Sequence, residues 1–276
     1  MSAKKTTART AASAAAAKRD KKGDKKSDAL MVRSVEKAFR VLEVFGGRRQ
    51  SLNLSQVADA TGMDISAAQR FTHTLTRLGY LHKDAETKRF ELTPKNLTQG
   101  YRFLLGHRLV ERAMPYLLHL STETEEAVNL TVLDDTEIIF VARFMSRHML
   151  NTNVVVGTHM PAYCTASGIA MLSHLPRAEA LDILDRTDLR RHTPTTTWRR
   201  KDLIAKLNLS ATQGFATAFG EVYKGDLSVA SAILDERGRP EGAINVAVSF
   251  TRYKKEEVAA RFGPMVVEAA RAVSRV

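Results

Sequence analysis

The sequence predicts an α+β fold, with a winged helix-turn-helix near its start and a larger mixed domain behind it. Three observations support this prediction. Apolar residues recur at helical spacing in three short segments between residues 34 and 78, and a polar hairpin follows at 80–92. Beyond residue 125 the period changes, and strand-like runs come in two groups with helical segments between and after them. At 276 residues the chain is long enough for about two ordinary domains.

The first two predicted helices are short and amphipathic. The apolar stripe of the first consists of Val35, Ala38, Leu42 and Phe45. The apolar face of the second consists of Leu54, Val57 and Ala58. The glycine pair 46–47 ends the first helix, and Asn53 or Ser55 can cap the second. Both helices are therefore expected to pack on a shared small core.

The third predicted helix, 65–78, has two faces of opposite character. Its apolar face consists of Ala68, Phe71, Leu75 and Leu78. Gly62 supplies the freedom that a tight corner before this helix needs, and Asp64 can cap it. A helix held by an apolar seam, with donors and cations facing outward, suits a DNA major groove. We expect DNA contacts from Ser66, Gln69, Arg70, His73 and Arg77. The alternative is an ordinary solvated face.

The segments 80–83 and 89–92 are predicted strands, which the polar connection 84–88 joins into a hairpin. Three helices and this hairpin make a winged helix-turn-helix, assigned to residues 29–95. The hairpin is basic, and its Lys83, Lys88 and Arg89 are expected to touch the DNA backbone rather than the bases.

A helical connector is expected at 96–110, followed by the α+β domain at 111–276. The connector suits dimerisation or the relay of strain, although plain packing explains it as well. Pro115 is expected to start or kink a helix. Predicted strands lie at 128–133, 137–142, 215–219, 227–234 and 242–248. Predicted helices lie at 167–175, 177–186, 200–213 and 254–276.

The formal charge of +12 is concentrated at the start of the chain. Residues 1–28 carry +6 and residues 29–95 carry +4, which leaves +2 for the remainder. This distribution argues for a polyanion that meets the N-terminal part. The tail at 1–28 has too few large apolar residues to fold and is expected to be disordered. It either adds nonspecific affinity for phosphates or only keeps the chain soluble.

Several classes of protein and site are disfavoured. The single cysteine, Cys164, rules out a disulfide framework and suits a reducing cytoplasm. Since the sequence contains no apolar run near 18 residues, we expect a cytoplasmic protein without a membrane partner. The eight histidines form no ligand-like cluster, so neither a metal nor another cofactor is expected. Cys164 and His159 lack an orienting third group, so no catalytic residue is predicted.

The order of these motifs resembles the IclR family of bacterial regulators. The segments that carry the resemblance are 32–38, 54–58, 62–63 and 78–81, followed by the α+β domain. The resemblance covers nearly everything after the tail. It implies a GAF-like effector domain, a small organic acid as effector, and a homodimer or dimer of dimers. The implied target is a two-fold symmetric operator in double-stranded DNA.

Within the family, the chain looks most like the branch that governs the β-ketoadipate pathway and related aromatic-acid catabolism. The segments that carry this likeness are 141–143, 156–158, 161–165, 167–168 and 243–246. Residues 165–167 fall where the family's pocket offers backbone amides, and a helix start favours a carboxylate. The resemblance implies an effector site of Cys164, Thr165, Ala166, Ser167, Glu221, Ser228 and Asn245.

Two points about that site stay open at this stage. Many family members place an acidic pair shortly after the segment that is 214–216 here. This chain instead has 218–220, Ala-Phe-Gly, before Glu221, so relatives do not identify the effector. Arg143 and Arg147 can pair with an effector carboxylate or with a local acidic residue.

The sequence therefore predicts a DNA-binding transcriptional regulator controlled by a small organic acid, either aromatic or dicarboxylic. The acid would favour one arrangement of the effector domains and so change the spacing of paired recognition helices. One alternative is an enzyme that acts on a small aromatic acid through the C-terminal domain. Another is a nonspecific DNA-compacting protein that binds through the basic tail.

Overall fold

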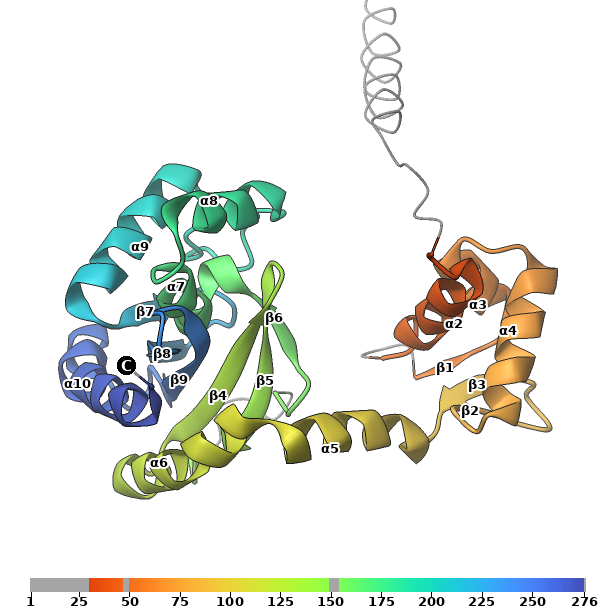
Figure 1. Cartoon of the computed structure of the whole chain (residues 1–276), viewed down its shortest axis with the longest axis horizontal. Coiled ribbons are helices and arrows are strands. Elements are labelled where there is room, and N and C mark those ends of the chain that lie inside the picture. The colour runs from red at the N-terminus through yellow and green to blue at the C-terminus, as the bar shows by residue number, and fades with distance from the viewer. Residues whose placement is uncertain (1–29, 47–49, 149–153, 276) are drawn as a thin grey trace, which may run out of the picture. The chain divides into compact units, whose positions relative to one another are not determined.

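The computed structural model describes residues 30–46, 50–148 and 154–275, and the predicted basic tail lies outside them. The chain divides into two compact units, Met1–Thr98 and Gln99–Val276 (Figure 1). The domain boundaries expected at 95/96 and 110/111 stay a prediction. No helix in the described part of the chain is long and apolar enough to cross a membrane.

The first unit is a winged helix-turn-helix (Figure 1). Its helices are α2 (Arg33–Glu43), α3 (Leu54–Thr61) and α4 (Ile65–Arg77). Its strands are β1 (Ser51–Leu52), β2 (Leu81–Lys83) and β3 (Phe90–Leu92). The antiparallel hairpin β2–β3 matches the expected wing, and the short β1 adds a third strand beside β3. The helices and the hairpin enclose one small apolar core.

Local sequence sets the corner between α3 and α4. Asn53 and Gln56 form a reciprocal capping box, with Gln56 N donating to Asn53 Oδ1 at 2.9 Å. Gly62 ends α3 in the left-handed region at φ +68, which glycine adopts without steric cost. Asp64 then caps α4, because Ala67 N donates to its Oδ1 at 2.8 Å. This hydrogen bond is the main reason that the pKa of Asp64 lies below its usual range.

Two residues assigned to apolar faces are exposed instead. Val35 is 51% exposed, and the fully buried side chain of α2 is Val41. The other residues of the predicted stripe, Ala38, Leu42 and Phe45, are half-buried or buried, so the prediction fails only at its N-terminal end. Leu78 is 53% exposed, because α4 ends at Arg77 and Leu78 is its C-cap.

A short 3-10 helix, η2 (Pro94–Asn96), leads into α5 (Leu97–Gly106) and then α6 (Arg108–Thr124). The expected connector is thus not one continuous helix, since His107 is the extended N-cap of α6. Pro115 lies inside α6, and the helix continues to Thr124.

The second unit is built on a six-stranded antiparallel sheet of order β6-β5-β4-β9-β8-β7. The strands are β4 (Ala127–Asp134), β5 (Glu137–Phe144), β6 (His159–Pro161), β7 (Ala216–Phe219), β8 (Asp226–Leu234) and β9 (Pro240–Ser249). Five strands correspond to predicted ones. The sixth, β6, was not predicted, because three residues are too few to show an alternating pattern.

Helices cover both faces of this sheet (Figure 1). The remaining ones are η3 (Ala162–Cys164), α7 (Ala166–Leu172), α8 (Arg177–Arg186), α9 (Arg200–Gln213) and α10 (Lys255–Val273). One apolar core lies between the sheet and α6 with α10. A second core lies between the other face and α7, α8 and α9. The predicted α+β class is confirmed, and a pocket opens in the second core.

Candidate functional site

The outward face of α4 carries all five side chains expected to meet DNA. The buried side of this helix is formed by Ala68, Thr72 and Leu75. Ser66, Gln69, Arg70, His73 and Arg77 are all exposed, as are Ile65 and Thr74. Because the five predicted positions recur every three or four residues, they form one stripe along the helix.

Arg70 is the centre of this stripe. Together with Gln69 and His73 it borders a shallow hollow that also includes Lys83 of the wing. On its other side Arg70 borders a second hollow with Arg33 and Lys37 of α2. Neither of these two α2 cations was predicted to contact DNA, although they lie one helical turn apart. The surface around α4 is therefore cationic on both sides of Arg70.

The three wing cations have different environments. Lys83 and Lys88 are exposed, and Lys88 Nζ donates to Ala85 O at 2.5 Å. Arg89 is partly buried, and its guanidinium donates to Ser51 Oγ at 2.9 Å and to Ser51 O at 2.6 Å. It also donates to Gln56 Oε1 at 3.3 Å. Arg89 thus ties the wing to β1 and α3, and a DNA contact from it stays a prediction.

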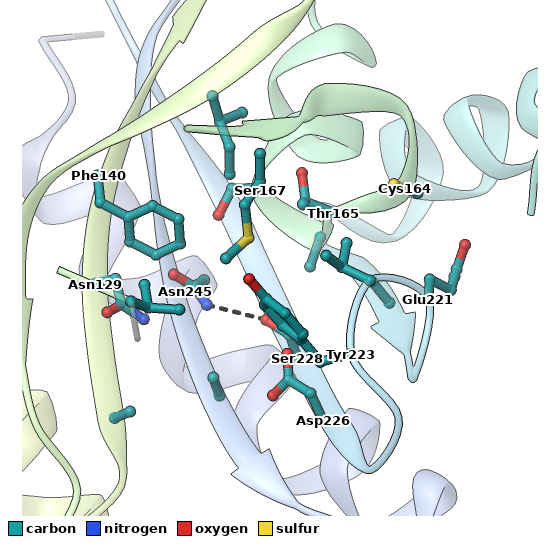
Figure 2. Close-up of a pocket in the computed structure, with 18 of the residues that line it drawn as sticks. Asn129, Phe140, Cys164, Thr165, Ser167, Glu221, Tyr223, Asp226, Ser228 and Asn245 are labelled. Carbon is teal, nitrogen blue, oxygen red and sulfur yellow. Dashed lines mark hydrogen bonds between the residues drawn. The ribbon is translucent and has the colours of Figure 1, made fainter. Parts of the chain in front are cut away.

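The second unit contains a pocket between its sheet and the start of α7 (Figure 2). The space in it that can hold the centres of water molecules is about 60 Å³, so the pocket is small in this structure. All seven predicted effector residues line it, from Cys164 to Asn245. Asn129, Phe140, Tyr223 and Asp226, which were not predicted, also line it, and so does Arg143, one of the two arginines considered as partners of an effector carboxylate. Contacts with an effector stay a prediction for each of them.

The start of α7, at the pocket wall, packs closely against the backbone of η3. Thr165 is the N-cap of α7, and its Oγ1 accepts from Gly168 N at 3.2 Å. A Cβ added at Gly168 would lie 2.1 Å from Ala162 O, so only glycine fits there. The first amides of a helix have no partner within it, and Ala166 and Ser167, which carry those of α7, both line the pocket.

A bulge brings Arg143 to the pocket face. Leu130 pairs with Ala142 and Thr131 pairs with Phe140, so Val141 is an extra residue in β5. Side chains alternate between the two faces of a strand, and one extra residue reverses this alternation. Arg143 therefore lies beside Asn129 on the pocket face, where its Nη1 donates to Asn129 Oδ1 at 2.8 Å.

The pocket wall contains two carboxylates, Glu221 and Asp226, and neighbouring groups offset their negative charges to different extents. Glu221 is buried, forms an ion pair with Lys206, and accepts from Thr197 N at 2.9 Å. Burial raises the pKa of Asp226 to about 6, and the positive charge of Arg143 opposes only part of this shift. Asp226 begins the largely apolar strand β8, and Asn129 lies between apolar residues near the start of β4, so a polar residue in a buried run is the sequence signal that could have identified both.

The geometry does not support thiolate chemistry at Cys164. Burial raises the pKa of its thiol to about 12, and the charge of Glu221 adds to the shift. His159 is an exposed residue of β6, and its Nδ1 lies 3.3 Å from Glu137 Oε2. Among the described residues there is also no group of three His, Cys, Asp or Glu side chains that could hold a metal ion.

A winged helix-turn-helix followed by an α+β unit with a pocket in its core defines a class of transcription factor. The chain belongs to the IclR family of bacterial transcriptional regulators. Residues 34–85 match the IclR helix-turn-helix domain. Residues 102–275 match the C-terminal domain of bacterial transcriptional regulator IclR.

Individual relatives agree with this assignment. The chain is 30% identical over 245 residues to the Pca regulon regulatory protein of Pseudomonas putida, covering 88% of this chain and 84% of that one. This relative supports the expected branch of the family. A transcriptional regulator from Rhodococcus sp. RHA1 has a solved structure with a TM-score of 0.76 and 31% identity, covering 89% and 98% of the two chains.

A further solved structure shows the same fold at lower identity. It is an IclR homologue from Microbacterium hydrocarbonoxydans in complex with 4-hydroxybenzoate. The TM-score is 0.73 and the identity 21%, with coverage of 87% of this chain and 97% of that one.

Proposed function

We propose that this regulator binds specific operator sequences and that a small organic acid in the pocket of the second unit controls its affinity for them. The observation that carries the proposal is the convergence of side chains and helix-start amides from distant parts of the chain on one pocket. An aromatic or dicarboxylic acid is the class of effector that fits best.

The chemistry of the pocket wall favours an anion with an apolar body. The amides of Ala166 and Ser167 and the start of α7 offer donors to a carboxylate. Lys206 neutralises Glu221, and Asp226 is protonated more readily than an ordinary carboxyl group. The pocket therefore repels an anion less than its two acidic residues imply. Ile138, Phe140 and Met160 supply apolar surface for a ring or a methylene chain.

Self-association is part of the proposal. Leu97, Tyr101 and Leu105 recur every four residues along α5 and are 75%, 63% and 73% exposed. Residues at this spacing share one face of a helix, and an exposed apolar stripe favours contact with a second copy. A homodimer or a dimer of dimers would present paired recognition helices to a symmetric operator in double-stranded DNA. The site of action would be the cytoplasm, where a bacterium keeps its chromosome.

The test begins with the DNA sequence that the full chain selects from a random pool. Its affinity is measured by fluorescence anisotropy at rising salt, beside random DNA of equal length, with and without 4-hydroxybenzoate, benzoate or succinate. We expect the selected fragment to stay bound at salt concentrations that release random DNA, and at least one acid to change its affinity. Equal loss of both DNAs would point to nonspecific compaction instead.

A pocket variant links the acid to its site. Ser167→Trp should fill the pocket, abolish calorimetric binding of the acid, and leave DNA binding without acid unchanged. Ala218→Leu, on the opposite wall, serves if Ser167→Trp does not fold. An unchanged titration in a folded variant would contradict the site. Chromatography of the acid after incubation separates binding from turnover, and a product would favour the enzyme alternative.

A further inference from the structure

Two buried amide atoms on the sheet side of the pocket have no partner among residues 30–46, 50–148 and 154–275. They are Asn129 Nδ2 and Asn245 Oδ1. The two residues are 1% and 6% exposed, and both line the pocket. They pair directly across β4 and β9, and Figure 2 shows them close together on the same wall. Because an unpaired buried polar group is costly, these two atoms are available to a molecule that enters the pocket.

Each of the two side-chain amides already makes one hydrogen bond within the protein, and this bond determines which of its atoms remains for a ligand. Arg143 can only donate, and it donates to the oxygen of Asn129, so the amide nitrogen is the atom left for a ligand. Asn245 donates through Nδ2 to Ser228 Oγ at 2.9 Å, which leaves its oxygen for a ligand. The pair therefore offers one donor and one acceptor at neighbouring positions.

A hydroxyl is the smallest ligand group that satisfies both atoms, because it accepts and donates at once. A carbonyl or ether oxygen would leave Asn245 Oδ1 unpaired, and an ammonium group would leave Asn129 Nδ2 unpaired. We infer that the effector is a hydroxylated acid whose hydroxyl accepts from Asn129 and donates to Asn245. This inference rests on the proposed function, and it makes Asn129 and Asn245 the residues that select for the hydroxyl.

Calorimetry with acids that differ by one hydroxyl tests the inference. The matched probes are benzoate with 3- and 4-hydroxybenzoate, and succinate with malate, while 4-formylbenzoate presents a carbonyl only. With the full chain, we expect at least one hydroxylated acid to bind at least about tenfold more tightly than its parent, because the parent leaves both buried amide atoms unpaired. The carbonyl probe should bind less tightly than the preferred hydroxylated acid, because it accepts from Asn129 but leaves Asn245 Oδ1 unpaired.

Two substitutions of similar volume locate the effect. In Asn129→Leu and Asn245→Leu the hydroxylated acid should bind no more than about threefold more tightly than its parent acid, because each variant removes one hydrogen-bond partner of the hydroxyl. The ratio of the two affinities is compared within each variant, and its circular dichroism and melting temperature report an intact fold. Asn208→Leu, at an exposed position on α9, is the matched control and should keep the full advantage. If Asn129→Leu does not fold, Asn245→Leu carries the test alone.

The outcomes separate this inference from the proposed function. Equal binding of parent and hydroxylated acids by the unmodified chain would overturn the inference and leave the proposed function standing. If both Leu variants still bind the hydroxylated acid at least about tenfold more tightly than its parent, the inference is likewise overturned and the proposed function stands. Failure of every probe to bind would overturn the proposed class of effector and the inference with it.

Discussion

Arg70 is the single side chain on which DNA recognition by α4 is expected to depend most. It is exposed and borders both hollows around the recognition helix. Arg70→Ala should weaken binding of the selected DNA by at least about tenfold, since one good contact to a base is worth about 1–3 kcal/mol. The melting temperature and the affinity for the acid should not change.

The control for this prediction is Arg191→Ala, which removes the same charge from an exposed position in the second unit. Fluorescence anisotropy on both variants separates a local contact from a general loss of positive charge. Equal weakening by the two substitutions would contradict the assignment of Arg70 to the DNA-contacting face.

Asp226 gives a second prediction at this scale, concerning stability and pH. Its pKa is about 6 in the folded chain and 3.8 without the fold, so the native state holds the proton more tightly. The contribution of Asp226 to stability is therefore complete below about pH 4 and is lost as the pH rises through 6. The loss amounts to about 3 kcal/mol.

Urea unfolding of the parent chain and of Asp226→Asn between pH 4 and 7.5 measures this effect. The asparagine does not titrate, so the variant should gain stability relative to the parent as the pH rises and then level off above about pH 7. Parallel pH profiles for the two chains would show that Asp226 is not desolvated.

The glycines illustrate what a single sequence reveals about individual residues. Gly62 could be assigned to a turn, because cap residues flank it and its conformation depends on local chain geometry. Nothing around Gly168 marks it in the same way. Its constraint is contact with Ala162 O, which only the folded backbone brings close.

At the scale of elements, α7 is the helix whose position the pocket depends on. Gly168→Ala should push α7 away from η3 and reduce the free energy of unfolding by about 1–3 kcal/mol or more, as overpacking does. Binding of the acid should weaken as well, because the amides of Ala166 and Ser167 move with the helix.

Gly100→Ala is the matched control on α5. A Cβ at Gly100 meets nothing within 4 Å, so alanine should stabilise the helix by about 0.5–1 kcal/mol. Chemical denaturation and calorimetry on both variants check the pair. Similar effects of the two substitutions would show that the close approach at Gly168 is not a constraint.

For the whole molecule, the central prediction is reciprocal coupling between DNA and acid. If the acid changes the affinity for DNA by some factor, DNA must change the affinity for the acid by the same factor. Typical coupling of 1–3 kcal/mol corresponds to about 5–150-fold. Calorimetry of the acid with and without selected duplex, beside anisotropy of the duplex with and without acid, measures both sides. Coupling that persists in Ser167→Trp would place the acid elsewhere.

The sequence by itself determined the parts of this protein that depend on neighbouring residues. Helix caps, the corner at Gly62, the amphipathic face of α4 and most strand positions follow from local spacing and local hydrogen bonds. The order of those segments also led to the right family. The tertiary structure decided which polar groups share the pocket.

The physical reason is that strand faces depend on register and bulges, which long-range pairing sets. Without the extra residue Val141, Arg143 would point to the opposite face of the sheet and could not orient Asn129. Asn129 and Asn245 are more than a hundred residues apart in the chain and become neighbours only through pairing of β4 with β9. Tertiary folding also places the Arg89 guanidinium against Ser51, where it donates a hydrogen bond, and pairs Glu221 with Lys206.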